Sequence, residues 1–383
     1  MGDIRRILIL RKSSLGDIIH TLPAFYALRH ARPQAEIHWA VEGRGRAIVE
    51  RARGVDGILD FSLGSMAGAR SMRFDMVLDF QGLLKTAVAA RVIGGRRVGF
   101  DRGYAREPLC HLFYTDRVVP KGVHVIEQNL SLVEAAIGEP VPARDYEFGD
   151  LLTSAEVRRV DSDLGRMGIE PGFVLINAGA GWANKRWSPK KFGELARCLS
   201  GRQVVVAYGP DDKTTAEAVV EASEGRAMLA FPTTFLEFGA LASRSALVVS
   251  GDSGPMQLAS AVGARVLGLF APTSPFRNGP WNKGDKYLIG RCRLGEKRQL
   301  PVRCTLPAGP VRTAREAGPL SAPSMSAAIV RFVRRELFFP PRDSLCHDFF
   351  CYRRQCAGRN CIDKIEVADA VETAMEMLGR CNA

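Results

Sequence analysis

Hydrophobic residues in the first part of the chain form short runs that alternate with helical patterns. Residues 4–10 (IRRILIL) predict a buried strand, and residues 18–28 repeat apolar positions at the spacing of a helix that is expected to begin after Asp17. Further strands are predicted at residues 35–43, where the pattern alternates, and at 74–82 and 96–100, with a glycine-closed helix at 83–95. Strands that alternate with helices predict a parallel sheet covered on both faces.

The same pattern restarts after a polar stretch at residues 140–160. Strands are predicted at residues 173–179, 202–209, 245–251 and 264–272, and helices at residues 188–201, 214–223 and 255–263. The predicted fold class is therefore α/β, with two Rossmann-like, doubly wound parallel sheets that face a cleft. Ligands of such sheets bind beyond the carboxyl ends of the strands.

The length of 383 residues exceeds what one hydrophobic core usually accommodates. We predict an N-terminal domain over residues 1–155, a C-terminal domain over 156–290, a basic insert of low order over 291–342, and a Cys-rich segment with a final helix over 343–383. No apolar run approaches the ~18 residues of a membrane span, and the N-terminus lacks the pattern of a signal peptide. These features indicate a cytosolic protein.

Positive charge is unevenly distributed. The formal net charge is +12, and residues 291–342 hold eleven Lys and Arg against three Glu. A basic balance suits nucleic acid, an anionic membrane surface or an acidic substrate, but a solvated insert has the same composition. The aromatic and basic residues form no nucleic-acid motif, so no nucleic-acid partner is expected.

Three turns between a strand and a helix carry residues suited to chemistry. The first is SSLGD at residues 13–17. Gly16 allows a tight turn, and Asp17 then lies near the N-terminus of a helix, whose partial positive charge favours a carboxylate. Such an acid is often only a helix cap. An exposed acid at this edge of a sheet is also suited to accept a proton from a hydroxyl nucleophile.

The second turn is NAGAGWANKRW at residues 177–187. Small residues including Gly181 let a ligand approach the main chain, and Lys185 brings positive charge. Trp182 and Trp187 bracket this charge, which suits a diphosphate with a ring nearby. A glycine-rich loop with solvated cations explains the stretch equally well.

The third turn is SGDSGPMQLASA at residues 250–261. Ser253 or Gly254 can cap the helix and Pro255 can start it, so that free N–H groups point out toward an anion. Asp252 would repel that anion, and is more suited to binding sugar hydroxyls or orienting the loop. The standard dinucleotide and P-loop fingerprints are absent.

These turns, in this order, resemble glycosyltransferase family 9, the lipopolysaccharide heptosyltransferases. The resemblance rests on KSSLGDIIHTLPA, VLDFQGLLKTA, GYAREPL, GAGWANKRW and GDSGPMQLASA, and it covers residues 4–290 and the Cys-rich end. AREPLCHLFY, at residues 105–114, is most similar to the heptosyltransferase I branch, which acts on the inner core.

The resemblance implies a GT-B fold and an inverting transfer of heptose from ADP-heptose to the Kdo-lipid A inner core, at the cytoplasmic face of the inner membrane. It implies no metal and no cofactor. Asp17 would be the general base, and Lys185 would neutralise the diphosphate leaving group. The donor site would comprise Gly16, Gly181, Lys185, Asp252, Ser253, Gly254 and Gln257, and the acceptor site Gln81, Lys85 and Arg106.

Two departures from the family pattern stand out. Gln257 occupies a position where the family commonly has His, and Gln cannot carry a charge. The basic insert is not part of the usual pattern. These departures motivate an alternative from another class, a catalytically inactive GT-B protein that binds nucleotide sugars. Release of ADP that depends on the lipid acceptor distinguishes the enzyme from the binding module.

Two further segments leave alternatives open. Four cysteines recur at every fifth position, namely Cys346, Cys351, Cys356 and Cys361. We favour reduced structural thiols over a zinc or iron–sulfur site, because the spacing is looser than CxxC pairs. Residues 326–339 form a basic amphipathic pattern, which suits an anionic membrane and a packed helix equally.

Overall fold

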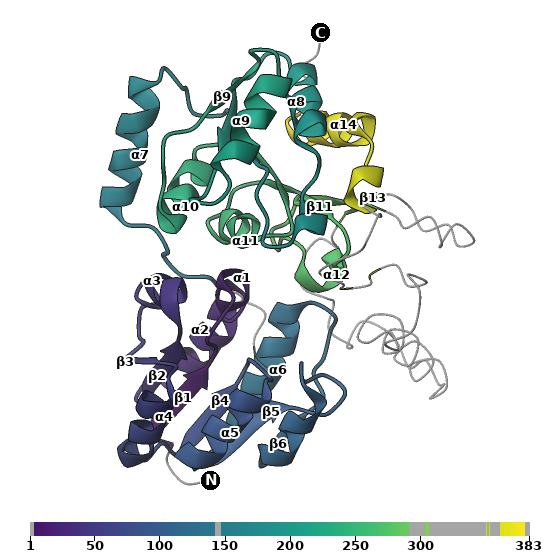
Figure 1. The fold of residues 1–383 in the computed structure, drawn as a ribbon. Helices are drawn as coiled ribbons and strands as arrows, with labels where there is room; N and C mark the ends of the chain where they lie inside the picture. The colour runs from purple at the N-terminus through teal and green to yellow at the C-terminus, as the bar shows by residue number, and fades with distance from the viewer. Residues whose placement is uncertain are drawn as a thin grey trace, which may run out of the picture. The chain divides into compact units, whose positions relative to one another are not determined.

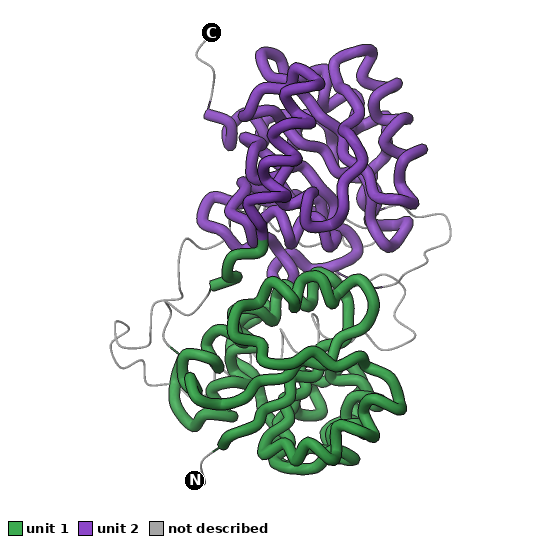
Figure 2. The backbone as a smooth tube through the Cα atoms, turned by 90° about the vertical axis from the view of Figure 1, so that its left-hand side faces the viewer, with its two compact units in different colours: residues 1–151 green, residues 152–383 purple. Residues whose placement is uncertain are grey.

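The computed structural model describes residues 4–141, 147–290, 303–305 (backbone only), 350, 352 and 361–379. The chain forms two compact units, residues 1–151 and 152–383 (Figure 2). The boundary predicted after residue 155 would cut helix α7 (Ser154–Arg166), whose first turn is fixed by a capping box. Glu156 accepts a hydrogen bond from the Thr153 N–H at 2.8 Å, so the second unit must include both residues.

Unit 1 contains a six-stranded parallel sheet in the order β3-β2-β1-β4-β5-β6 (Figure 1). Its strands are β1 (Arg6–Leu10), β2 (Glu36–Val41), β3 (Gly57–Asp60), β4 (Met76–Asp79), β5 (Arg96–Phe100) and β6 (Asp116–Val118). Its helices are α1 (Leu15–Ile19), α2 (Leu22–Ala31), α3 (Arg46–Val49), α4 (Leu63–Ala69), α5 (Leu84–Ile93) and α6 (Val125–Ile137), with short 3-10 turns η1 (Gly43–Gly45), η2 (Arg70–Met72) and η3 (Pro108–Phe113). The strand order doubles back after β3, as in a doubly wound sheet.

Helices cover both faces of this sheet. Helix α2 packs against α6, and α4 packs against α5. On the α4–α5 side, Met66, Phe74 and Ile93 join Leu8 and Val77 of the central strands in one buried cluster. Strand β2 is buried along nearly its whole length, because both faces of the sheet are covered. The alternating sequence pattern of this strand predicted burial of alternate residues only.

Unit 2 contains a seven-stranded sheet in the order β13-β12-β11-β10-β7-β8-β9, in which β13 alone is antiparallel to its neighbour. Its strands are β7 (Val174–Asn177), β8 (Val204–Ala207), β9 (Ala227–Leu229), β10 (Leu247–Gly251), β11 (Val266–Phe270), β12 (Lys286–Ile289) and β13 (Arg303–Thr305). Besides α7, its helices are α8 (Pro189–Cys198), α9 (Lys213–Ala222), α10 (Phe235–Ser243), α11 (Gly254–Ala261), α12 (Pro275–Asn278) and α14 (Val367–Met377), with 3-10 turns η5 (Ala183–Lys185) and η7 (Cys361–Lys364). Two doubly wound sheets are thus confirmed.

The C-terminal helix completes the core of unit 2 rather than forming a separate segment. Helix α14 packs against α8. Its buried residues Ala370, Ala374 and Met377 belong to the same hydrophobic cluster as Trp187, which lies just before α8. Gly290 directly follows β12, and a Cβ added to it would lie 2.1 Å from the carbonyl oxygen of Cys361. The two positions are therefore in direct contact.

Within the described ranges, no helix combines the length and the apolar character that crossing a bilayer requires.

Asp285 generates a prediction about stability. It is 2% exposed and accepts hydrogen bonds from the Val266 N–H (2.8 Å), the Asn282 N–H (2.9 Å) and the Ser260 hydroxyl (3.0 Å). Burial raises the pKa of Asp285 from 3.8 to about 6. Because the folded pKa lies above the unfolded one, this group stabilises the fold below pH ~4, and that contribution is lost as the pH rises toward 6.

The difference in unfolding free energy between wild type and Asp285→Asn should therefore shrink by up to about 3 kcal/mol between pH 4 and pH 6, as measured by urea denaturation. Asp161→Asn is the matched control, because Arg244 lowers the pKa of Asp161. Its difference from wild type should shrink as the pH falls below ~4. A pH-independent difference for Asp285→Asn contradicts the prediction.

Candidate active site

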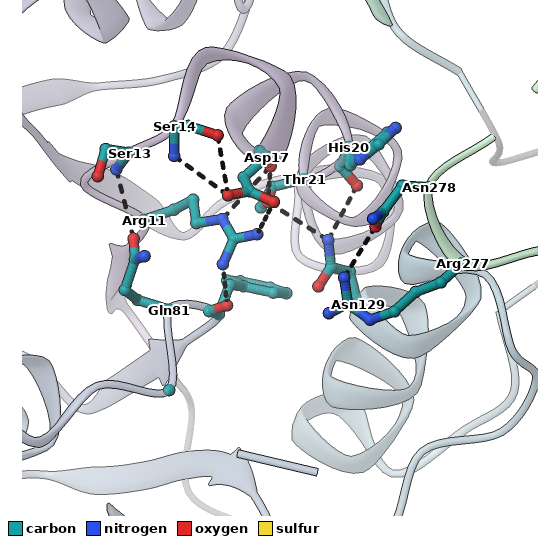
Figure 3. Close-up of polar contacts among 12 residues, drawn as sticks. Arg11, Ser13, Ser14, Asp17, His20, Thr21, Gln81, Asn129, Arg277 and Asn278 are labelled. Atoms are coloured by element: carbon teal, nitrogen blue, oxygen red, sulfur yellow. Dashed lines mark hydrogen bonds and ion pairs between the residues drawn. The ribbon is translucent and has the colours of Figure 1, made fainter. Parts of the chain in front are cut away.

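The loop after β1 presents Asp17 from inside a helix. Helix α1 begins at Leu15, with Ser14 as its N-cap, so the prediction that the helix begins after Asp17 was wrong. The Ser14 N–H and hydroxyl donate to Asp17 Oδ2 at 3.2 and 3.0 Å (Figure 3). The acid thus satisfies a donor at the helix start, the local reason for a carboxylate at this position.

Arg11 holds the same carboxylate from the opposite side. Its Nη2 lies 3.1 Å from Asp17 Oδ1, and its Nε donates to the Asp17 carbonyl at 3.3 Å. The Arg11 side chain is 7% exposed and also donates to the Phe80 carbonyl, so the guanidinium is fixed beneath the loop. The Asp17 side chain remains 28% exposed. The carboxylate is therefore oriented by charge and still reaches solvent.

The junction of α1 and α2 is fixed by α6. Thr21 Oγ1 donates to the Asp17 carbonyl at 2.8 Å, and Asn129 Nδ2 donates to the His20 carbonyl at 2.9 Å (Figure 3). Asn129 is 1% exposed. Buried amides of this kind fix the main chain because leaving them unpaired costs about 1–3 kcal/mol.

Gln81 supports the loop rather than reaching solvent. It is 4% exposed, and its Oε1 accepts hydrogen bonds from the backbone N–H groups of Lys12 (3.1 Å) and Ser13 (3.3 Å) (Figure 3). This placement does not match the expected acceptor contact. Its oxygen instead ties the turn after β4 to the segment that leads into Asp17.

Asp79 fixes the turn after β4, and the sequence analysis did not identify this role. The side chain is fully buried at the end of β4 and accepts hydrogen bonds from the N–H groups of Gln81 (2.9 Å) and Gly82 (3.1 Å) and from the Tyr114 hydroxyl (2.8 Å). Burial raises the pKa of Asp79. The available signal was an acid that ends a continuous apolar strand within VLDFQG.

Lys85 and Arg106 lie beside the same turn and are exposed. The nearby ammonium group of Lys12 lowers the pKa of Lys85. Gly82, at φ +63°, lies against Arg106, since an added Cβ would be 3.1 Å from the Arg106 N atom. The three cations Lys12, Lys85 and Arg106 therefore gather near one turn, with Lys12 paired to Glu42.

In unit 2, a buried amide joins the two candidate donor loops. Asn177 ends β7 beside Ser250 of β10. Its Nδ2 donates to Ser250 Oγ (2.9 Å), Ser253 Oγ (3.3 Å) and the Gly179 carbonyl (3.2 Å). Asn177 is 4% exposed. One amide therefore fixes the loops after β7 and β10 relative to each other.

Lys185 and Asp252 form an ion pair across these loops. Lys185 Nζ lies 2.5 Å from Asp252 Oδ2, which also accepts a 2.6 Å hydrogen bond from the Thr273 hydroxyl. The Trp182 ring centroid lies 4.4 Å from the same ammonium. Asp252 thus carries its own counter-ion. Trp187, expected as a ring beside a ligand, is instead 1% exposed and donates to the Ile365 carbonyl at 3.1 Å.

The remaining residues predicted for the donor site have different structural roles. Ser253 caps α11 by accepting a hydrogen bond from the Met256 N–H, and Gly254 and Pro255 are its first two residues. Gln257 is 4% exposed and donates to the Asn278 carbonyl at 2.7 Å, so it holds the end of α12. Gly181 is exposed with open space around it, whereas Gly16 is buried in α1.

The question of a metal concerns residues that are largely outside the described ranges. Cys346, Cys351 and Cys356 lie outside them, as do residues 326–339. Cys361 is the first residue of η7 and is partly buried. In the part of the chain that the structure describes, no group of three or more His, Cys, Asp or Glu side chains is placed to hold a metal ion.

Solved structures of glycosyltransferases share this pair of sheets. The E. coli heptosyltransferase WaaC with ADP aligns at a TM-score of 0.59 and 22% identity, over 72% of this chain and 93% of its own. A glycosyl transferase family 9 protein from Veillonella parvula aligns at 0.71 and 19% identity, over 99% and 98%. The fold is therefore GT-B, two Rossmann-like domains with helices on both faces of each sheet.

The sequence comparisons define the family. The profile of glycosyltransferase family 9 (heptosyltransferase) matches residues 67–305. Lipopolysaccharide heptosyltransferase 1 of Pseudomonas aeruginosa is 28% identical over 74% of this chain and 83% of its own length, and that of Salmonella typhimurium is 28% identical over 73% and 92%. The chain belongs to glycosyltransferase family 9, and it is a glycosyltransferase.

The support that Gln81 gives to the Asp17 loop can be tested directly. Gln81→Ala leaves two N–H groups without their partner, which should lower the free energy of unfolding by about 1–3 kcal/mol. Hydrogen exchange of residues 12–17 should accelerate. Gln128→Ala is the matched control, because Gln128 is an equally buried glutamine that bonds the Val123 carbonyl. Equal acceleration of exchange in both variants contradicts the assignment.

Proposed function

We propose that this protein transfers heptose from ADP-heptose to the Kdo-lipid A inner core of lipopolysaccharide, with inversion at the anomeric carbon. Two features together carry the proposal. Unit 1 has an oriented Asp17 carboxylate that reaches solvent, and unit 2 has the ion pair of Lys185 and Asp252 on glycine-rich loops. Curated relatives named lipopolysaccharide heptosyltransferase 1 support the reaction class. WaaC, solved with ADP-2-deoxy-2-fluoro heptose, supports the donor.

Asp17 is the proposed general base. A hydroxyl of the acceptor gives its proton to the Asp17 carboxylate while its oxygen forms a bond to the anomeric carbon. The bond from that carbon to the diphosphate oxygen breaks, and ADP leaves with the electron pair. Arg11 and Ser14 hold the carboxylate in one orientation, so it does not need to reorganise during transfer.

Lys185 is the proposed partner of the leaving diphosphate. Negative charge grows on ADP as the glycosyl bond breaks, and a nearby ammonium stabilises that charge. Asp252, which accepts a hydrogen bond from the Thr273 hydroxyl, holds Lys185 in place before the donor arrives. Gly181 leaves room for the phosphates, and Ser253 and Gly254 at the start of α11 offer N–H groups. The proposal needs no metal and no cofactor.

Lys85 and Arg106 are the proposed contacts of the acceptor. Both are exposed beside the turn that carries Gln81, and positive charge suits the carboxylate of Kdo and the phosphates of lipid A. Gln81 and Gln257 act through the main chain that they hold, and Gly16 acts through the tight start of α1. Because the acceptor is a lipid, we place the protein peripherally at the cytoplasmic face of the inner membrane.

The alternative of an inactive binding module is not favoured, because the chain belongs to a family of enzymes. The deciding measurement is ADP release from ADP-heptose with and without Kdo-lipid A. An enzyme releases ADP only when the acceptor is present, and truncated lipopolysaccharides then identify the sugar that accepts. ADP-heptose binding without any acceptor-dependent release leaves only the binding module.

The role of Asp17 predicts a clear separation of effects. Asp17→Asn should lower kcat by about 10²–10⁴-fold, the usual contribution of a general base, while ADP affinity stays within about twofold. Asp56→Asn is the matched control, since Asp56 is an arginine-paired acid elsewhere in unit 1. Steady-state transfer and calorimetry with ADP provide the two readouts. Asp17→Asn with more than half of wild-type turnover excludes Asp17 as the base.

A further inference from the structure

Helix α5 and the η3 turn expose aliphatic side chains. The exposed fractions are Leu84 39%, Val88 41%, Val92 45%, Leu109 57% and Leu112 60%. These five side chains define what we call the α5–η3 face. Leu and Val on a solvent-exposed helix cost hydration free energy, and contiguous apolar patches on soluble proteins usually mark an interaction site.

The exposed residues of α5 occupy one side of the helix. Leu84, Val88 and Val92 are four residues apart, which aligns them along the axis. The opposite side is buried, with Ala89, Ala90 and Ile93 packed into the core of unit 1. Helix α5 is therefore apolar on both sides, and packing against the sheet buries only one of these sides.

The η3 turn adjoins the start of α5. Glu107, the residue before η3, accepts a hydrogen bond from the Leu84 N–H at 2.5 Å, and its own N–H donates to the Gly82 carbonyl at 2.9 Å. Helix α5 and η3 are also in direct contact. Leu109 and Leu112 thus lie on a turn that packs against α5 and is joined to its first residue.

Cations flank this surface. Lys85 and Arg91 are exposed on α5 between its aliphatic residues, and Arg106 is exposed beside Gly82. Glu107 is an exposed acid among them, and it is engaged in capping α5. An apolar stripe with basic residues at its margin matches the interface of an anionic bilayer, where aliphatic groups enter the acyl boundary and cations meet lipid phosphates.

We propose that the α5–η3 face docks on an anionic lipid bilayer. Its aliphatic residues enter the boundary between headgroups and acyl chains, and Lys85, Arg91 and Arg106 contact the phosphates. The link to the acceptor rests on the proposed function. A lipid acceptor keeps its acyl chains in the bilayer, so residues that bind its headgroup must lie at the membrane surface. Lys85 and Arg106 meet that requirement because they flank this face.

The test measures binding of the full chain to vesicles. Wild type should sediment with vesicles of phosphatidylethanolamine and phosphatidylglycerol, less so at high salt, and weakly with phosphatidylcholine vesicles. Val88→Gln, Val92→Gln, Leu109→Ser and Leu112→Ser together should lower the partition coefficient at least tenfold, or about 1.4 kcal/mol. Met167→Gln, at a residue 40% exposed in unit 2, should bind as wild type does.

Two further variants sharpen the result. Arg91→Gln should weaken binding to anionic vesicles and leave binding to neutral vesicles unchanged. Deletion of residues 326–339 tests the other membrane candidate. The proposal fails if wild type does not sediment with anionic vesicles. It also fails if the fourfold variant, shown to be folded by its thermal unfolding, binds as wild type does. Loss of a dimer in the fourfold variant, seen by sedimentation velocity, would assign the face to self-association instead.

Transfer assays separate this proposal from the proposed function. With a deacylated, water-soluble acceptor, the fourfold variant should retain wild-type turnover, because none of its four positions is assigned to the site. With the acceptor embedded in vesicles, its turnover should fall in parallel with binding. If wild type transfers heptose to neither acceptor, the proposed function is wrong, and the vesicle measurements alone decide the docking proposal.

Discussion

The carboxylate of Asp79, fully buried at the end of β4, is the constraint on which the geometry of unit 1 depends. A buried acid is costly unless donors surround it, and the N–H groups of the following turn are among those donors. That turn is thereby fixed, and it places Gln81 so that its oxygen meets the N–H groups of Lys12 and Ser13. The chain then enters α1 in a conformation that leaves the Asp17 carboxylate accessible to solvent. The proposed general base is thus positioned through main-chain contacts that begin in the core.

Unit 2 solves the corresponding problem with a neutral group. Asn177 joins two loops through amide hydrogens, which introduces no charge beside the predicted diphosphate site. The charged groups of these loops are paired, Lys185 with Asp252 and Arg186 with Asp212. Because Asn177 is neutral, it adds no second negative charge beside Lys185, whose field is already offset by the buried carboxylate of Asp252.

The sequence predicts the central strands well, because strands buried on both faces are continuous apolar runs, and it predicts α8 from its Ser-Pro start. It does not predict α6, because Gln128, Asn129 and Ser131 are polar yet buried, which hides the periodicity. Helix α7 was included in a polar linker, because few of its residues reach the core. In the site, loop composition identified Asp17 correctly as a helix-start acid. The other predictions depended on burial, which the sequence does not show. Trp187 is a residue type that often contacts ligands, but it lies in the core. The ion-pair partner of Asp252 is set by the order of the strands in the sheet and not by spacing along the sequence.

The contact between Gly290 and Cys361 brings the two ends of residues 291–360 together. Parts of this stretch also belong to unit 2, because β13 pairs with β12 and Phe350 is 4% exposed. Closing a loop between fixed ends costs only ~0.6 kcal/mol more for each doubling of its length. Insertions and deletions that leave β13, Phe350 and this junction in place should therefore cost unit 2 little stability.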